Sequence, residues 1–173
     1  GAAAVNQGLE DMGIESYIKW PNDILIQGKK VCGILTEMNC ELNIINYVIM
    51  GIGINIDLDK KDFGKELSDK AISLKEVVGQ INRKKLLGNI LNHFEDLYKD
   101  FIEREDISKS INICRTNSIL LGKEVRVIRG GNCDVGKALD IDDEGQLIIE
   151  YKDGRLEKIF SGEISIRGLK GYV

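Results

Sequence analysis

The sequence has few of the residues from which metal and redox sites are built. It contains a single histidine, and none of its four cysteines forms a Cys-x-x-Cys pair. Because a zinc site needs closely spaced ligand pairs, the sequence does not indicate one. We therefore expect the cysteines to be small, buried or half-buried apolar groups of a cytoplasmic protein. They are Cys32, Cys40, Cys114 and Cys133.

Long apolar runs and an excess of positive charge are also missing. No run approaches the roughly 20 residues of a membrane-spanning helix. Residues 1–4 lack the basic flank and long apolar segment of a signal peptide. The formal net charge of -4 argues against a general nucleic-acid-binding protein. The chain has 173 residues, enough for one domain with a good core or for one medium and one small domain. It begins without methionine and directly with a helix, so we expect a piece of a longer protein.

The only proline and the only tryptophan stand side by side at residues 20–21. Proline should end a short strand at Trp20, because it removes a backbone donor and favours extended geometry before it. A second strand is predicted over 24–26 and a third over 31–35, joined by a hairpin turn at 27–30. This pattern places Asn22 and Asp23 at the entrance of a strand, where short polar side chains can cap the backbone or face a ligand.

Helical spacing of apolar residues predicts helices over 2–12, 74–78 and 82–105. The apolar stripe of the last helix is predicted to be core. His93 lies beside this stripe, and we interpret it as a boundary or surface residue rather than a general base.

The apolar run 44–56 predicts a strand buried on both faces. Its Gly-x-Gly resembles part of a dinucleotide-binding motif, but a charged loop over 57–70 follows where that motif needs a third glycine and a helix. We instead expect these glycines to let a nucleotide or a packed helix approach the strand.

From Gly122 onward the sequence predicts a small antiparallel β-barrel. Five short β-rich runs are separated by turn residues, at 124–128, 135–141, 146–151, 156–160 and 163–167. The expected fold is therefore α/β, of the α+β type, with a mixed β-sheet and packing helices followed by this barrel. We place the domains at 1–118 and 119–173.

Several motifs together resemble one known family. Lys-Trp-Pro-Asn-Asp at 19–23 is followed by Lys-x-x-Gly-Ile-Leu-x-Glu at 30–37 and Gly-Ile-Gly-Ile-Asn at 51–55. Ala-Ile-Ser-Leu at 71–74, Ser-Gly-Glu-Ile-Ser-Ile-Arg at 161–167 and Gly-Tyr at 171–172 continue the match in order. The chain is thus similar to the biotin protein ligases, the biotin-[acetyl-CoA-carboxylase] ligases, and its final region resembles their Src-homology-3-like domain.

The resemblance implies a reaction and a set of ligands. Ligases of this family use ATP and Mg²⁺ to convert biotin into biotinyl-5'-adenylate, and then transfer biotin to a lysine of a carrier domain. Because the reaction brings two anions together, the site must supply fixed positive charge. The resemblance assigns this role to Lys30, which would contact the biotin carboxylate and the α-phosphate.

Other residues receive binding roles from the same resemblance. Asn22 would contact adenine or order the adenylate, and Asn55 would be a second adenine or ribose contact. Asp23 would hold Mg²⁺ or orient the carrier lysine, while Lys19 is a second-rank candidate. The floor under biotin would be formed by Gly33, Ile34 and Leu35.

Simpler interpretations stay open on local chemistry alone. Lys29 and Lys30 could be solvated turn lysines, Asn22 and Asp23 could cap a turn, and Trp20 could be core. The chain also lacks the Gly-Arg-Gly-Arg-x-Gly loop of the family, so it resembles the C-terminal half of a ligase. We expect it not to form the adenylate efficiently alone, and any DNA binding to need a domain absent from this chain.

Two other functions remain alternatives. One is a lipoate-type acyl-adenylating ligase, which shares the catalytic architecture. The other is a non-catalytic module for homodimerisation or for docking of a carrier protein.

Overall fold

The computed structural model describes residues 1–42, 44–162 and 164–169. Glu163 and the Gly-Tyr pair at 171–172, which belong to the family pattern, lie outside the described residues. Two antiparallel sheets and their helices confirm the α+β class. None of the helices in the described ranges is both long enough and apolar enough to cross a membrane.

The first sheet has the strand order β1-β2-β3-β4. Its strands are β1 (Tyr17–Lys19), β2 (Asp23–Ile26), β3 (Lys29–Glu41) and β4 (Ile44–Ile54). All three pairings between these strands are antiparallel, whereas a mixed sheet was expected. Parallel contacts among the described residues are two isolated bridges, Ile18 to Ser118 and Lys30 to Ala71.

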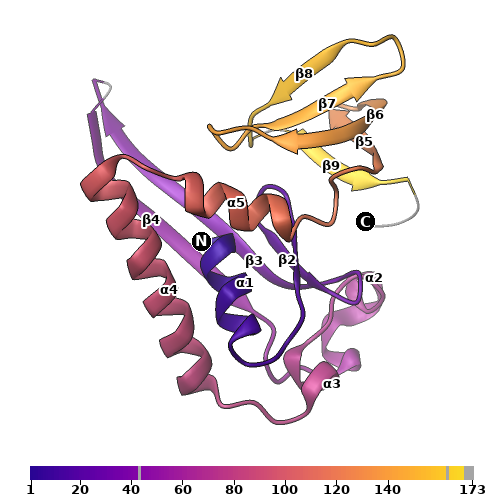
Figure 1. Cartoon of the computed structure of the whole chain (residues 1–173). Helices are drawn as coiled ribbons and strands as arrows, with labels where there is room; N and C mark the ends of the chain where they lie inside the picture. Colours follow the sequence, from indigo (N-terminus) through magenta and orange to yellow (C-terminus); the bar gives the residue numbers. More distant parts are fainter. Residues whose placement is uncertain (43, 163, 170–173) are drawn as a thin grey trace.

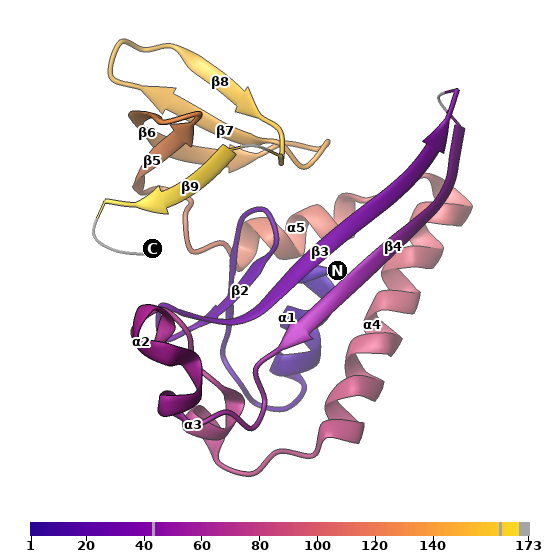
Figure 2. The ribbon, with the colours of Figure 1, turned by 180° about the vertical axis from the view of Figure 1, so that it is seen from behind.

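Helices lie on one face of this sheet (Figures 1 and 2). They are α1 (Ala2–Glu10), α4 (Arg83–Arg104) and α5 (Ser108–Thr116), the last of which was not predicted. Gly8 of α1 packs so closely on α4 that an added Cβ would lie 2.6 Å from Ile90 Cγ1. His93 of α4 is half-buried and contacts Asp11 across this junction, with Nε2 2.8 Å from Oδ2.

The segment between β4 and α4 contains three short helices. These are the 3-10 helix η1 (Lys60–Phe63), α2 (Gly64–Leu67) and α3 (Leu74–Val78). The first two lie in the region expected to be a loop. Ser73 begins α3 with a capping box, accepting a hydrogen bond from the backbone of Glu76 while the Glu76 side chain accepts one from Ser73.

The prediction that residues 44–56 are buried on both faces is wrong. Strand β4 is an edge strand that pairs with β3, and its residues 44–53 are exposed. Helices α1, α4 and α5 lie behind this strand pair in Figure 2. An apolar run is typical of burial, but burial also requires a second layer, which the described residues do not supply at this face. Large exposed side chains on β4 include Ile45, Tyr47, Val48 and Ile49.

The apolar stripe of α4 is only partly core. Leu86 and Ile90 are buried, whereas Leu91, Tyr98 and Phe101 are exposed. At 1.5 Å per residue, α4 is about 33 Å long and α1 about 14 Å, so α1 covers only part of the stripe. The prediction that the cysteines are buried or half-buried is confirmed for Cys32 and Cys114 and wrong for Cys40 and Cys133, which are exposed.

The second sheet has the order β8-β7-β6-β5-β9, a five-stranded antiparallel arrangement consistent with the expected small barrel. Its strands are β5 (Glu124–Arg129), β6 (Asn132–Ile141), β7 (Leu147–Tyr151), β8 (Leu156–Ile159) and β9 (Ile164–Gly168). Their inward side chains form a second core, separate from the core under the first sheet.

Candidate active site

An ion pair between Lys30 and Asp23 lies at the centre of the candidate site. Lys30 Nζ is 2.5 Å from Asp23 Oδ1. The Lys30 side chain remains 39% exposed and that of Asp23 only 11%, so the ammonium can still meet a ligand while the carboxylate is nearly covered. Strand pairing causes this contact, because β2 and β3 run antiparallel and place Asp23 opposite Gly33.

Gly33 makes room for the lysine. A Cβ at this position would lie 2.8 Å from both Cε and Nζ of Lys30. The lysine therefore rests on the bare backbone of β3. The two members of the ion pair, Asp23 and Lys30, and the glycine that makes room for it, Gly33, all lie on the hairpin of β2 and β3.

The backbone around Lys30 is fixed by two later motifs. Its amide donates to Lys70 O at 2.8 Å, and its carbonyl accepts from Ile72 N at 3.0 Å. Asn55 Nδ2 donates to the carbonyls of Ile72 at 3.2 Å and of Lys30 at 3.4 Å. The structure thus gives Asn55 a role in holding the Lys30 strand, and Asn55 is not among the described residues that line the two cavities below.

Asn22 ties the loop before β2 to β3. Its side-chain Nδ2 donates to Ile34 O at 2.6 Å, and its backbone carbonyl oxygen accepts from Ile34 N at 3.0 Å. Only one of the two side-chain N–H groups is used in this contact, and the side-chain amide also carries the acceptor Oδ1, so both a donor and an acceptor can serve a ligand.

Lys19 is buried, with 6% of its surface exposed, and stands opposite Asp23 in the pairing of β1 with β2. Burial lowers its pKa from 10.5 to about 8. The neighbouring charge of Asp23 raises the Lys19 pKa, and those of Arg167 and Lys30 lower it further. Lys19 therefore lies within electrostatic reach of one carboxylate, Asp23, and of two other cations, Arg167 and Lys30, although the chain as a whole carries a net charge of -4.

Two adjoining cavities contain these groups. The larger, about 710 Å³, lies between the two sheets and is lined by Lys19, Asn22 and Asp23 on one side and by β9 on the other. The smaller, about 550 Å³, is an open depression lined by Lys30 and by the glycines of β3 and β4. Asn22, Ile34 and Leu35 line both. Every predicted site residue except Asn55 therefore lines one or both of these cavities.

The described residues do not form a resident Mg²⁺ site. Asp23 is the only carboxylate among those that line either cavity, and its Oδ1 is paired with Lys30. Across the described ranges, no group of three His, Cys, Asp or Glu side chains could hold a metal. A magnesium ion here would have to be bound largely by phosphate oxygens, as is common for Mg²⁺.

Sequence reasoning missed Arg167 and Ser165, which lie on β9 and line the larger cavity. Arg167 is exposed and its Nε contacts Ser165 Oγ at 3.3 Å. Both residues belong to the Ser-Gly-Glu-Ile-Ser-Ile-Arg motif, so the match was the available signal. No local pattern showed that this strand would face the first sheet.

Comparisons with known sequences agree with these motifs. The model of the biotin/lipoate A/B protein ligase family matches residues 1–55, and that of the biotin protein ligase C terminal domain matches residues 120–167. The bifunctional ligase/repressor BirA of Bacillus subtilis is 41% identical over 95% of this chain and 51% of its own length. The biotin--[acetyl-CoA-carboxylase] ligase of Mycobacterium tuberculosis is 30% identical over 87% of this chain and 53% of its own length.

Solved structures show the same relationship. The apo structure of biotin protein ligase from Aquifex aeolicus matches with a TM-score of 0.83 and 30% identity, over 96% of this chain and 72% of that chain. The complex of the Aquifex aeolicus ligase with biotin and ATP matches with a TM-score of 0.81 and 30% identity, over 96% of this chain and 68% of that chain. This chain spans about half the length of the Bacillus subtilis and Mycobacterium tuberculosis relatives.

Proposed function

Because this chain belongs to the biotin protein ligase family, we propose that it supplies the adenylate-forming part of a biotin-[acetyl-CoA-carboxylase] ligase. The observation that carries the proposal is the Lys30–Asp23 ion pair together with Lys19 and Arg167, which act electrostatically on each other and line a cavity large enough for a nucleotide. The Aquifex aeolicus ligase, which shares this fold, was solved with biotin and ATP.

In the proposed first step, a biotin carboxylate oxygen attacks the α-phosphorus of ATP. A new P–O bond forms and the bond to the β-phosphate oxygen breaks, so that pyrophosphate leaves. Lys30 is the proposed catalytic residue, since its partly exposed ammonium can contact both anions and stabilise the charge that develops between them. In the second step the neutral amine of a carrier lysine attacks the acyl carbon, an amide bond forms, the bond from the acyl carbon to the phosphate oxygen breaks so that AMP leaves, and the amine releases a proton.

Lys19 and Arg167 would bind the phosphates that depart. Both line the larger cavity, from opposite sheets. A bound polyanion would also favour the charged form of Lys19, offsetting the effect of burial on its pKa. Mg²⁺ would enter as the counter-ion of ATP and shield its phosphates, and Asp23 would be the carboxylate of this chain available to hold it.

The remaining predicted contacts fit the smaller cavity. The smaller cavity is lined by Gly33, Gly51 and Gly53, whose bare backbone would let a planar ring of the ligand approach closely. Ile34 and Leu35 would supply apolar surface for biotin. Asn22 would contact adenine through Oδ1. The role of Asn55 would be indirect, through the strand that carries Lys30.

The activity of the whole protein is also a proposal, since this chain spans about half of its bacterial relatives. We propose a biotin carboxyl carrier domain as acceptor, a cytoplasmic location, and DNA binding only through a further domain like that implied by the ligase/repressor names of relatives. We also propose the division at 1–118 and 119–173, and that this chain alone is a poor catalyst.

A specific observation favours a second candidate function. Strands β3 and β4 and helix α4 carry many large apolar side chains that are exposed, among them Leu35, Tyr47 and Tyr98. Such a surface suits binding of another polypeptide, as in homodimerisation or carrier docking. A lipoate-type ligase is the other alternative and would share the Lys30 chemistry.

Calorimetric titration of this chain with a non-hydrolysable biotinyl-adenylate analogue tests the proposal. We expect saturable binding, and a loss of at least tenfold in affinity in Lys30→Ala, because removal of a charged hydrogen-bond donor costs about 1.5–3 kcal/mol. Lys29→Ala is the matched control, being the neighbouring lysine that lines neither cavity, and should bind as wild type. Absence of binding, or tighter binding of the lipoyl analogue, would reject the biotin assignment.

A further inference from the structure

Trp20 belongs to the motif of the first sheet but packs in the core of the second. It follows β1 directly, is only 6% exposed, and lies in one cluster with Ile111, Leu120 and Ile141. The prediction that Trp20 is core is therefore confirmed, with the unexpected result that the core is that of the other sheet.

A directed hydrogen bond accompanies this packing. The indole Nε1–H of Trp20 donates to the carbonyl oxygen of Gly145 at 2.9 Å. Gly145 has φ +81°, a conformation that strongly favours glycine. Its amide donates to Asp142 O at 3.0 Å, closing the turn. The acceptor of the indole is thus held in a defined position.

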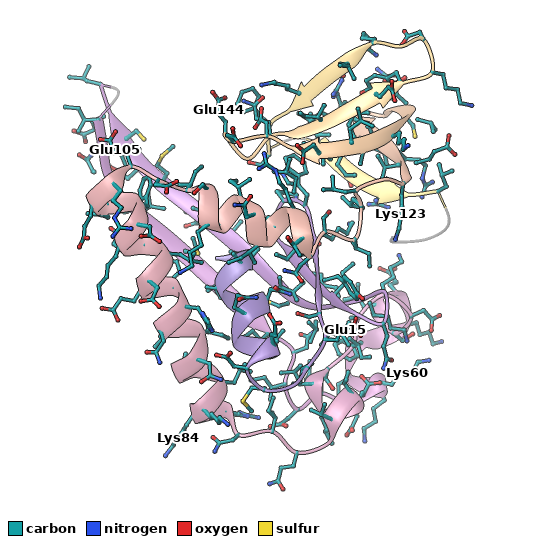
Figure 3. All side chains as sticks on the ribbon, in the orientation of Figure 1. Glu15, Lys60, Lys84, Glu105, Lys123 and Glu144 are labelled. Carbon is teal, nitrogen blue, oxygen red and sulfur yellow. The ribbon has the colours of Figure 1, made fainter. Side chains whose placement is uncertain are left out.

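Further bonds fix the turn 142–145 to α5 and to the sheet. Asp142 Oδ1 accepts from the amides of Glu144 and Gln146 at 3.0 and 2.9 Å. Arg115 of α5 donates from Nε to Ile141 O at 2.5 Å and from Nη2 to Asp143 Oδ1 at 2.9 Å. In Figure 3, Glu144 marks this turn at the edge of the second sheet, on the side of α5.

On the other side of Trp20 lies the candidate site. Only Pro21, whose φ is fixed by its ring, separates Trp20 from Asn22. Asn22 is bonded to Ile34 in both directions, and Asp23 pairs with Lys30. A displacement of the indole would therefore be transmitted over few free torsions to the groups that are proposed to bind the adenylate.

We propose that Trp20 is a positioning residue, through which the turn 142–145 of the second sheet sets the placement of Asn22 and of the Asp23–Lys30 pair. The inference rests on the proposed function for its consequence in catalysis. The second sheet would then affect adenylate binding in two ways: through the β9 residues that line the larger cavity, and through the turn that holds Trp20.

Two variants separate the hydrogen bond from the packing. Trp20→Phe removes the N–H donor and part of the ring. Because Trp20 is the only tryptophan in the chain, it can also be replaced throughout by benzothienylalanine, which keeps the bicyclic shape and has sulfur in place of N–H. Ile149→Val is the control, since it weakens the same core from β7, where Ile149 is buried, without touching the turn.

The first readout is amide hydrogen exchange at Ile34, which reports on its bond to Asn22. We expect Ile34 to exchange at least fivefold faster in both Trp20 variants and at the wild-type rate in Ile149→Val. Each protein is measured at the same temperature interval below its own unfolding midpoint, so that differences in overall stability do not enter. The second readout is affinity for the biotinyl-adenylate analogue, expected to fall at least fivefold in the Trp20 variants only.

Exchange of Ile34 at the wild-type rate in both Trp20 variants would overturn the inference. An equal change in Ile149→Val would overturn it too, because it would reduce the effect to general loss of stability. If the wild-type chain did not bind the analogue, the proposed function would fail, while the exchange experiment would still decide whether Trp20 positions the site.

Discussion

Replacing Lys19 with methionine should stabilise the chain near neutral pH while weakening phosphate binding. Lys19 is 6% exposed, and burial lowers its pKa from 10.5 to about 8. That change corresponds to about 3 kcal/mol of lost stability when the amine is charged. Methionine has a similar length without the charge, so we expect Lys19→Met to be about 1–3 kcal/mol more stable at pH 7.

The sign of the pH dependence follows from the direction of the shift. Between pH 8 and 10.5 the unfolded chain binds more protons at Lys19 than the folded chain does, so wild-type stability rises with pH there. Below pH 8 the penalty is complete. The advantage of Lys19→Met should therefore shrink by about 2 kcal/mol between pH 7 and pH 10.

Urea denaturation of both proteins at pH 7, 8, 9 and 10 measures this difference, because contributions from groups common to both cancel. A stability difference that stayed constant within about 0.5 kcal/mol across this range would refute the reasoning, since it would mean that Lys19 keeps an ordinary pKa in the folded chain.

Two further predictions concern Gly33 and the cysteines. In Gly33→Ala the new Cβ would displace the end of Lys30, 2.8 Å away, so affinity for the adenylate analogue should fall severalfold with little change in the unfolding midpoint; wild-type affinity in calorimetry would contradict the contact. Under native alkylation followed by mass spectrometry, Cys40 and Cys133 should react within minutes, whereas Cys32 should resist because burial raises the pKa of its thiol to about 12. Fast labelling of Cys32 would show that the first core opens readily.

The sequence predicted the local elements well because their signals are local. Pro21 ends β1, Gly28 allows the hairpin turn with φ +74°, and five alternating runs become the five strands of the second sheet. Turn and strand chemistry at 24–35 also predicted the hairpin that carries Lys30, since a hairpin depends on neighbouring residues.

The errors concern what lies opposite each surface. Tyr47 and Ile49 of β4 are of residue types that are common in cores, yet both are exposed. Whether such residues are covered depends on where the helices and the other sheet lie. Arg167 could not be assigned to the site from its own surroundings, because its position depends on how β9 meets the first sheet. The partner of Trp20, 125 residues away at Gly145, is a long-range contact of the same kind.

The contact between Lys30 and Gly33 has an entropic consequence. A free lysine side chain carries about 2 kcal/mol of rotamer entropy, which a ligand would otherwise have to remove on binding. Here the chain lies against bare backbone and ends on Asp23, so much of that freedom is already lost when the protein folds. The ammonium then meets its anion with little further ordering, and a single missing side chain at position 33 becomes a determinant of affinity.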